Sequence, residues 1–291
     1  MGKLVLVCGA SGALGKEVAK GLVARGERVR AMVRDAAKAP AGVAETAIAD
    51  ALKPETLDAA MAGVDTVFSA LGASVLPGMS GWGGYTSVDV PANLNLLAAA
   101  KKAGVRRFVY VSVFHTPPMR ATPYIAAHET VVDALKASGL SVCIMRPTGF
   151  FSALGALVEM AKSGPLPSLG TGEAKSNPID DGELAALCVE AILSDETEVP
   201  CGGPDVLTRN QMSEAAFAAV GKPVKLQKAP VGAAKCAGTL MTPFHQRMGQ
   251  LALFIATLSE NDAVAPVRGK KRLADYFQQR ATSSESSAAR S

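Results

Sequence analysis

Short apolar runs alternate with longer amphipathic stretches from residue 1 to residue 148. Continuous apolar runs are typical of buried parallel strands, and apolar residues three or four positions apart, such as Leu14, Val18 and Leu22, are typical of helices. The predicted strands are Lys3–Cys8, Arg28–Val33, Glu45–Ala49, Thr66–Ser69, Arg107–Ser112 and Ser141–Met145. Because strands and helices alternate, we expect an α/β fold with a doubly wound parallel sheet, the Rossmann arrangement, over residues 1–148.

The second half of the chain is less regular and predicts a smaller, mostly C-terminal region that faces the substrate. We assign residues 149–178 and 196–280 to this region, with a helix near Gln211–Val220 and another near Leu251–Leu258. Residues 179–195 contain a clear helical pattern behind Asp180, a suitable helix cap, and are expected to return to the sheet. Residues 281–291 are rich in Ser and Ala without periodicity, which favours a disordered tail.

Glycines follow the first predicted strand in the spacing G-x-x-G-x-x-G, at Gly9, Gly12 and Gly15. Gly9 permits a tight turn, Gly12 lets the backbone approach a phosphate, and Gly15 lets the helix pack closely on the strand. The unpaired N–H groups and the dipole of a helix N-terminus favour a pyrophosphate at this point. The predicted contacts of a dinucleotide are Gly9, Ser11, Gly12, Ala13, Leu14 and Gly15.

Composition excludes several other classes of protein. The hydrophobic fraction is 48% and the formal charge is only +4, with scattered basic residues, so nucleic acid is not an expected partner. The five cysteines are odd in number and lack Cys-x-x-Cys spacing, which argues against metal ligands and a disulfide framework. No apolar stretch is long enough for a signal peptide or membrane span, so the expected location is the cytoplasm.

Arg34 ends the second predicted strand, about 20 residues past the glycines, where an acidic residue normally accepts a hydrogen bond from the ribose of NAD. A guanidinium at this position suits the 2′-phosphate of NADP, to which it can donate two charge-assisted hydrogen bonds. NADP(H) is therefore the expected cofactor. The alternative interpretation is a solvated surface arginine beside its own counter-ion, Asp35.

Four further segments accompany the glycine loop in order: VRAMVRD (29–35), VDTVFSALG (64–72), GVRRFVYVS (104–112), and SGL leading to RPTGF (138–150). With the loop they resemble the atypical short-chain dehydrogenase/reductases of the NmrA-like and isoflavone-reductase-like kind. The resemblance implies an NAD(P) site with Asp50 near the adenine, the turn Ala70-Leu71-Gly72 past the ribose and pyrophosphate, and Pro147 beside the nicotinamide. The second half of the chain matches the family only through Asn177–Asp181, so the resemblance does not identify the substrate.

The family's Tyr-x-x-x-Lys motif falls here on Tyr124 and His128. A lysine lowers the pKa of the tyrosine, whereas a histidine is mostly uncharged near neutrality and affects the phenol much less. We consider Tyr124 as a catalytic acid or as a plain aromatic at a helix start, and His128 as a cofactor-binding or proton-relay residue. Ser112 resembles the family's active-site serine, with a strand-end hydroxyl bonded to local backbone as the alternative.

Four residues are candidates for the substrate pocket. Phe150 and Phe151 would form an apolar wall, with core packing as the alternative, and His115 would face either the substrate or water. Trp82, the single tryptophan, lies in a glycine-rich segment after the fourth strand, where it would act in a lid or pack that segment onto the body. His115 and His128 have no third ligand at a suitable spacing, so no metal is expected.

The predicted function is an NADPH-dependent reductase of a small apolar carbonyl, enone or quinone-type metabolite. The alternative is a non-catalytic NADP(H)-binding redox sensor or scaffold of the NmrA-like type, which the histidine at position 128 favours. A weaker third hypothesis is an assembly factor that uses the apolar stretch Leu251–Ile255 as a contact surface. The sequence predicts neither the oligomeric state nor the identity of the small-molecule substrate.

Overall fold

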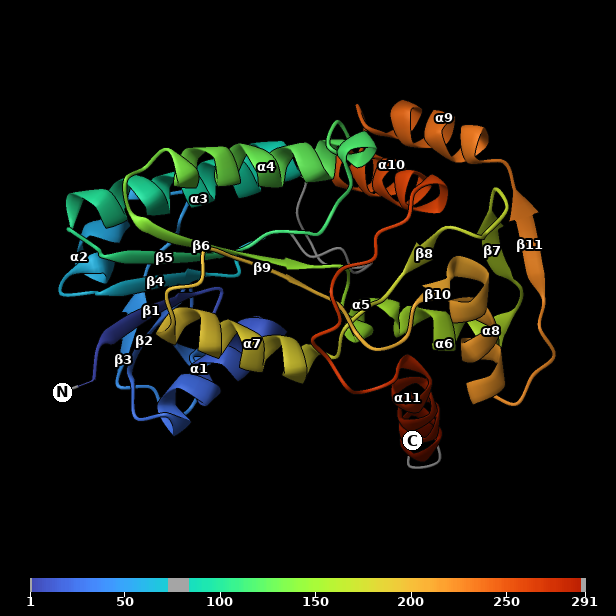
Figure 1. The fold of residues 1–291 in the computed structure, drawn as a ribbon, viewed down its shortest axis with the longest axis horizontal. Coiled ribbons are helices and arrows are strands. Elements are labelled where there is room, and N and C mark those ends of the chain that lie inside the picture. Colours follow the sequence, from blue (N-terminus) through green and yellow to red (C-terminus); the bar gives the residue numbers. More distant parts are fainter. Residues whose placement is uncertain (1, 73–83, 289–291) are drawn as a thin grey trace.

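The computed structural model describes residues 2–72 and 84–288. Two parts lie side by side (Figure 1): a large parallel sheet covered by helices, and a smaller region built from the second half of the chain. The main sheet has the strand order β3-β2-β1-β4-β5-β6-β9, and every pairing in it is parallel. The doubly wound α/β fold expected from the sequence is confirmed.

The strands of the main sheet are β1 (Leu4–Cys8), β2 (Arg28–Val33), β3 (Glu45–Ile48), β4 (Thr66–Ser69), β5 (Arg107–Val111), β6 (Ser141–Pro147) and β9 (Glu198–Cys201). All residues of β1, β4 and β5 are buried, which explains why they appear in the sequence as continuous apolar runs. Because the strands are parallel, their carboxyl ends meet at one edge, where a doubly wound sheet binds its ligand.

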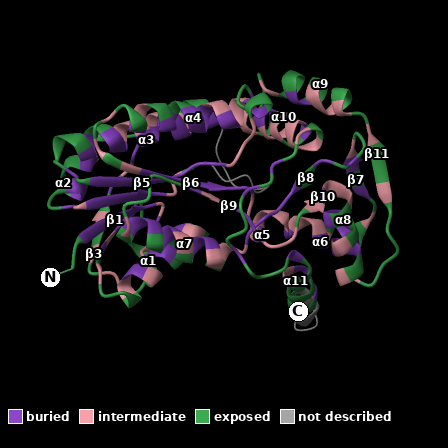
Figure 2. Ribbon diagram, viewed as in Figure 1, coloured by how far each residue is buried: buried purple, intermediate pink, exposed green. Residues whose placement is uncertain are grey.

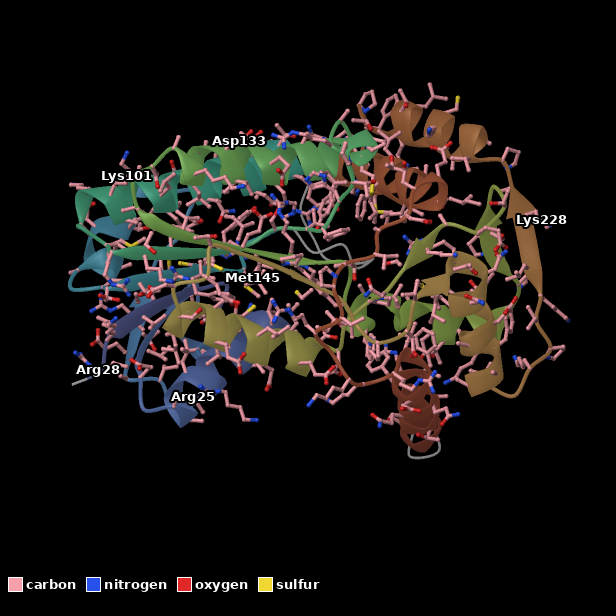
Figure 3. All side chains as sticks on the ribbon, in the orientation of Figure 1. Arg25, Arg28, Lys101, Asp133, Met145 and Lys228 are labelled. Atoms are coloured by element: carbon pink, nitrogen blue, oxygen red, sulfur yellow. The ribbon has the colours of Figure 1, made fainter. Side chains whose placement is uncertain are left out.

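Helices cover both faces of the sheet (Figure 1). On one face lie α2 (Leu57–Met61), α3 (Tyr85–Lys102) and α4 (Pro123–Lys136); on the other lie α1 (Ala13–Ala24) and α7 (Asp181–Leu193). Buried residues concentrate between these layers (Figure 2), with Met145 in the middle and Lys101 and Asp133 at the periphery (Figure 3). Helix α7 returns to the sheet beside α1, capped by the Asp180 carboxylate as expected.

Strand β9 differs from the sequence assignment, which places residues 196–280 in the substrate-facing region. It pairs with β6 and forms one edge of the main sheet. Pro200 lies within β9 and obscures its pattern, but a proline is tolerated on an edge strand because one side of the strand has no partner. The fully buried Arg107 of β5 donates hydrogen bonds to the carbonyls of Ala191 (2.8 Å) and Glu196 (2.7 Å), which holds the α7–β9 connection on the sheet.

The smaller region has its own core, which includes Phe217 and Phe277. Its strands pair as β7 with β11 and β8 with β10, and α10 packs against α9 and α4. Its elements are α5 (Phe151–Leu154), α6 (Ala156–Ser163), β7 (Leu166–Leu169), β8 (Lys175–Ser176), β10 (Leu207–Thr208), α8 (Arg209–Ala219), β11 (Leu226–Ala229), α9 (Val231–Met241), α10 (Gln246–Glu260) and α11 (Leu273–Ala288). Short 3-10 helices are η1 (Ala36–Lys38), η2 (Pro54–Thr56) and η3 (Pro117–Met119).

The C-terminal segment is helical where the sequence predicts a disordered tail from residue 281. Helix α11 continues to Ala288, and Ala281 is buried with Leu273 and Phe277 in the core of the smaller region. These three residues are spaced at four-residue intervals and form one apolar stripe, which anchors a helix whose Ser-rich composition alone does not predict it. Within the described part of the chain, no helix is long and apolar enough to cross a membrane.

Candidate active site

Two glycines at the turn between β1 and α1, Gly9 and Gly15, have no room for a side chain. Gly9 has φ +84°, and a Cβ added to it would lie 3.0 Å from the Ala70 carbonyl oxygen. A Cβ on Gly15 would lie 2.2 Å from the Gly9 carbonyl oxygen. The turn is closed by a hydrogen bond from the Gly12 N–H to the Gly9 carbonyl oxygen (2.9 Å). The backbones of β1, α1 and the turn after β4 therefore pack closely against one another.

Helix α1 presents an open N-terminus at this turn. Gly12 occupies the cap position without a side-chain hydrogen bond, and Ser11, Gly12 and Ala13 are exposed, with Leu14 half-buried. A Cβ on Gly12 would meet only the Gly9 carbonyl oxygen, at 3.3 Å, so its outer side is clear. These features fit the pyrophosphate of a dinucleotide, which pairs with free N–H groups and the positive end of the helix dipole.

Asn93 of α3 holds the turn Ala70–Gly72 in place. This residue is fully buried, and no sequence motif marks it. Its Oδ1 accepts a hydrogen bond from the Ser69 hydroxyl (2.7 Å), and its Nδ2 donates to the carbonyls of Leu71 (3.2 Å) and Asp89 (2.8 Å). Asn93 thereby fixes the backbone that faces Gly9 across the sheet edge.

Arg34 and Asp50 lie at the ends of β2 and β3. Arg34 is exposed and has no ion-pair partner among the described residues. The Asp35 carboxylate accepts a hydrogen bond from the Ala37 N–H (3.0 Å) and caps η1, so it is not engaged as a counter-ion of Arg34. The half-buried Asp50 accepts a hydrogen bond from the Leu52 N–H (3.0 Å) through one oxygen, which shapes the turn after β3.

A cavity of about 130 Å³ opens at the carboxyl ends of β5 and β6, where the sheet meets the smaller region. Of the predicted site residues, Ser112, Tyr124, Pro147 and Phe150 line it. The rest of its wall consists of Val113, Thr148, Gly149, Ala153, Leu154, Ser176, Pro178, Arg209, Phe254 and Leu258. The cavity is therefore mostly apolar, with a few hydroxyl groups and one guanidinium.

Two other predicted pocket residues, Phe151 and His115, do not line this cavity. Phe151 is buried in the core of the smaller region, with its ring centre 5.6 Å from that of Tyr276, because it begins α5 and points away from its neighbour Phe150. The Nε2 of His115 lies 3.4 Å from the Glu129 carboxylate. Trp82 and the segment expected to form a lid lie outside the described residues.

Tyr124 and His128 are adjacent on α4 and stack edge to face with ring centres 4.8 Å apart. Tyr85 and Phe254 enclose the Tyr124 ring further, at 4.6 and 4.4 Å, and burial raises the pKa of Tyr124 above its ordinary value. Tyr124 lines the cavity, and its hydroxyl makes no hydrogen bond with a described residue. Tyr124 is therefore fully protonated at neutral pH and is a weak acid.

His128 is buried, and its Nδ1 lies 2.8 Å from the Tyr110 hydroxyl. Burial lowers the pKa of His128 to about 4, with a further lowering by Arg146 that Glu129 opposes. The imidazole is therefore neutral at pH 7. The Tyr110 hydroxyl and the His128 Nδ1 share one hydrogen bond, and the tautomer of the imidazole decides which of them donates. In either tautomer the neutral imidazole carries one N–H group and no charge.

Ser112 is buried immediately after β5, and its Oγ has no hydrogen-bond partner among the described residues. The alternative interpretation, a hydroxyl bonded to local backbone, therefore does not match the structure. An unpaired hydroxyl in the wall of a cavity is suited to bind a polar atom of a ligand, since buried polar groups are normally satisfied.

An ion-pair network joins α4 to β6 and β9; its members Glu129 and Arg146 are buried, and Glu198 is exposed. The Arg146 guanidinium donates a 2.7 Å hydrogen bond to Glu129 and another bond to Glu198, and it also binds the Val113 carbonyl at 3.2 Å. Burial alone would raise the pKa of Glu129, but its bonds to Arg146 outweigh that effect and hold the pKa below its usual range. Sequence patterns did not identify this network, because its partners lie far apart in the chain.

The geometry defines a dinucleotide-binding Rossmann protein with an adjoining cavity. Over residues 9–195 the sequence matches the NAD(P)H-binding family, and the chain belongs to that family. An NAD(P)H azoreductase of Xenophilus azovorans is 30% identical over 247 residues, which cover 82% of this chain and 81% of that protein. A chloroplastic divinyl chlorophyllide a 8-vinyl-reductase of Cucumis sativus is 28% identical over 250 residues, but this chain spans only 59% of its length.

Solved structures with the same fold cover nearly the whole chain. An NADPH-dependent quinone oxidoreductase of Escherichia coli, in complex with NADPH, has a TM-score of 0.74 at 20% identity and covers 95% of this chain and 99% of that chain. A triphenylmethane reductase of Citrobacter sp. has a TM-score of 0.74 at 19% identity, with 96% and 99% covered. Together with the glycine turn and the open helix N-terminus, the family match identifies the ligand of this edge as NAD(P)H.

The two glycines of the turn predict different outcomes when each is replaced by alanine. In Gly12→Ala, the new methyl group would meet one backbone oxygen, at 3.3 Å, and would stand where the backbone must approach the phosphates, so NADPH affinity should fall by about 10-fold or more while the melting temperature falls less than in Gly15→Ala. In Gly15→Ala, overlap with the Gly9 carbonyl should lower the free energy of unfolding by about 1–3 kcal/mol. Fluorescence titration and thermal denaturation measure both effects, and equal behaviour of the two variants would contradict this account of the turn.

The buried neutral His128 predicts a loss of stability in acid. Its folded-state pKa is depressed to about 4, so between pH 6.5 and pH 4 the unfolded chain binds more protons and the folded state loses stability as pH falls. In wild type, the free energy of unfolding falls between pH 7 and pH 4.5. In His128→Asn this fall should be smaller by about 2 kcal/mol. Urea denaturation at both pH values measures this, with His245→Asn, at an exposed histidine, as the control that should behave as wild type.

Proposed function

We propose that the protein is an NADPH-dependent reductase of a small, mostly apolar carbonyl, enone or quinone-type substrate. The observation that carries this proposal is the cavity at the ends of β5 and β6, which combines the Tyr124 hydroxyl and the unpaired Ser112 hydroxyl with an apolar wall. It lies at the same sheet edge as the glycine turn. When bound, the cofactor supplies a hydride, and the chain supplies binding, orientation and a proton.

The protonation states of the site favour particular substrates within this class. Tyr124 is a weak acid because burial raises its pKa, and the neutral His128 beside it supplies no charge to assist proton release. Reduction of a simple ketone gives a strongly basic oxygen, so it needs a proton donor assisted by a nearby charge more than reduction of a conjugated substrate does. Quinones and enones spread the developing negative charge, so hydrogen bonds from Tyr124 and Ser112 would suffice to stabilise it. The azoreductase and quinone oxidoreductase relatives support this choice.

Arg34 supports NADPH as the preferred form of the cofactor. Its guanidinium is exposed at the end of β2 and is not engaged in an ion pair with the described residues. No acidic side chain takes this position to accept a hydrogen bond from the ribose of NAD. His128 would complete the site with a hydrogen bond to the nicotinamide ribose.

Replacing Arg34 should therefore change which dinucleotide is bound. In Arg34→Ala, affinity for NADPH should fall by about 10- to 100-fold because charge-assisted hydrogen bonds to the 2′-phosphate are lost, while NADH affinity stays the same. Fluorescence titration of both dinucleotides measures the ratio. Arg28→Ala, on the same strand but paired with Glu45 at 2.7 Å, is the matched control and should keep the wild-type ratio. An unchanged ratio in Arg34→Ala would remove the argument for NADPH.

A second candidate function is a non-catalytic NADP(H)-binding redox sensor. The observation that favours it is the neutral His128 at the position where the family pattern has lysine, because proton transfer by Tyr124 then lacks its usual assistance. The two functions differ in turnover: a sensor binds the dinucleotide without consuming it in the presence of any acceptor.

Turnover is tested by following NADPH absorbance with menadione, a conjugated enone and an aromatic ketone. We expect consumption with at least the quinone, and a decrease of about 100-fold in kcat in Tyr124→Phe, since the donor to the substrate oxygen is lost. Tyr276→Phe, in the core of the smaller region, is the control and should retain the wild-type rate. Tight NADPH binding without consumption of any acceptor would favour the sensor over the reductase.

A further inference from the structure

One charged side chain, Arg209, lies in the wall of the otherwise neutral cavity. It is the first residue of α8 and belongs to the smaller region, whereas Ser112 and Tyr124 in the same wall come from the end of β5 and from α4. Its Nε donates a 3.3 Å hydrogen bond to the Leu258 carbonyl. Its Nη2 is buried without a hydrogen-bond partner, and within the described residues the guanidinium makes no ion pair.

This arrangement is unfavourable for the protein without a ligand. An unpaired guanidinium that is removed from water costs free energy, and burial lowers the pKa of Arg209 to about 10, which still leaves it charged at pH 7. A cation in the first turn of α8 also lies at the positive end of the helix dipole. Packing and helix formation alone would therefore favour a neutral residue here.

The described residues provide no anion in the cavity wall to balance this charge. None of the other residues that line the cavity is acidic, and the sequence of residues 73–83 contains neither Asp nor Glu. Asp262 exerts an electrostatic influence on Arg209, but its exposed carboxylate accepts a hydrogen bond from the Lys175 N–H (2.7 Å) and forms no ion pair with the guanidinium. A bound ligand is the remaining source of the negative charge.

We propose that Arg209 determines substrate specificity by pairing with an anionic group of the substrate. This inference rests on the proposed function and names the substrate class more closely: an apolar, conjugated body that carries a carboxylate, sulfonate or phenolate. The body would lie against Phe150, Leu154 and Phe254, while the guanidinium donates the hydrogen bonds that it lacks at present. Arg209 acts here as a binding residue, separate from the donors Tyr124 and Ser112.

The test uses two probes of nearly equal shape and different charge, 2-naphthoate and 2-naphthamide. Calorimetric titration of the full chain, with and without NADP⁺, should show that naphthoate binds at least about 10-fold more tightly than naphthamide at pH 7. In Arg209→Gln the two probes should bind equally, and Arg209→Lys should retain part of the preference because it keeps the charge. Arg268→Gln changes an exposed arginine of the same region outside the cavity wall and should leave the preference intact.

Thermal denaturation of the ligand-free variants separates binding from folding. Arg209→Gln should unfold at the same temperature as wild type or higher, because it removes an unpaired buried charge. A clear loss of stability, equal affinities in wild type, no binding of either probe, or a preference that survives in Arg209→Gln would overturn the inference. Consumption of NADPH with menadione but equal binding of the probes would overturn it while leaving the proposed function standing. A preference for naphthoate without turnover would support it and tell against the reductase.

Discussion

The buried ion pair between Arg146 and Glu129 is the interaction on which the geometry of the site depends. It joins β6 to α4, and Arg146 extends it to the Val113 carbonyl and to Glu198 of β9. Such a pair adds little net stability compared with apolar packing, but removal of one partner leaves a buried charge and costs about 3–5 kcal/mol. Its effect is therefore to fix one relative placement of the helix that carries Tyr124 and His128 and the strand ends that carry Ser112 and Pro147.

The cofactor edge and the substrate cavity are specified by different kinds of contact. The cofactor edge is made of backbone: Gly9 and Gly15 allow chain segments to meet where a Cβ would overlap, and the buried amide of Asn93 holds the neighbouring turn. The cavity is made of side chains from both parts of the molecule. The backbone contacts suit a ligand that is common to a whole family, whereas the side chains of the smaller region can vary with the substrate.

The features predicted from the sequence are those with a local cause. Buried parallel strands are continuous apolar runs, and the glycine turn has a fixed spacing, so six strands and the cofactor class follow from short stretches of chain. Strand β9 was missed because four residues with a proline give no pattern, and α11 because its apolar residues matter only against the core that they help to form. The roles of Asn93, Glu129 and Arg209 depend on partners distant in sequence, which no local pattern records.

The placement of positive charge distinguishes this site from the family pattern. In that pattern a lysine one helical turn after the tyrosine supplies the charge, which acts on the phenol from the same helix. Here His128 occupies that position and is neutral, while the cavity's cation, Arg209, comes from α8 in the smaller region. Arg209 is not among the groups that shift the pKa of Tyr124, so its charge would act on a bound ligand. Under the proposed function, the chain would have less acid strength at the tyrosine and an electrostatic contact to the substrate, a combination suited to molecules that are readily reduced and negatively charged.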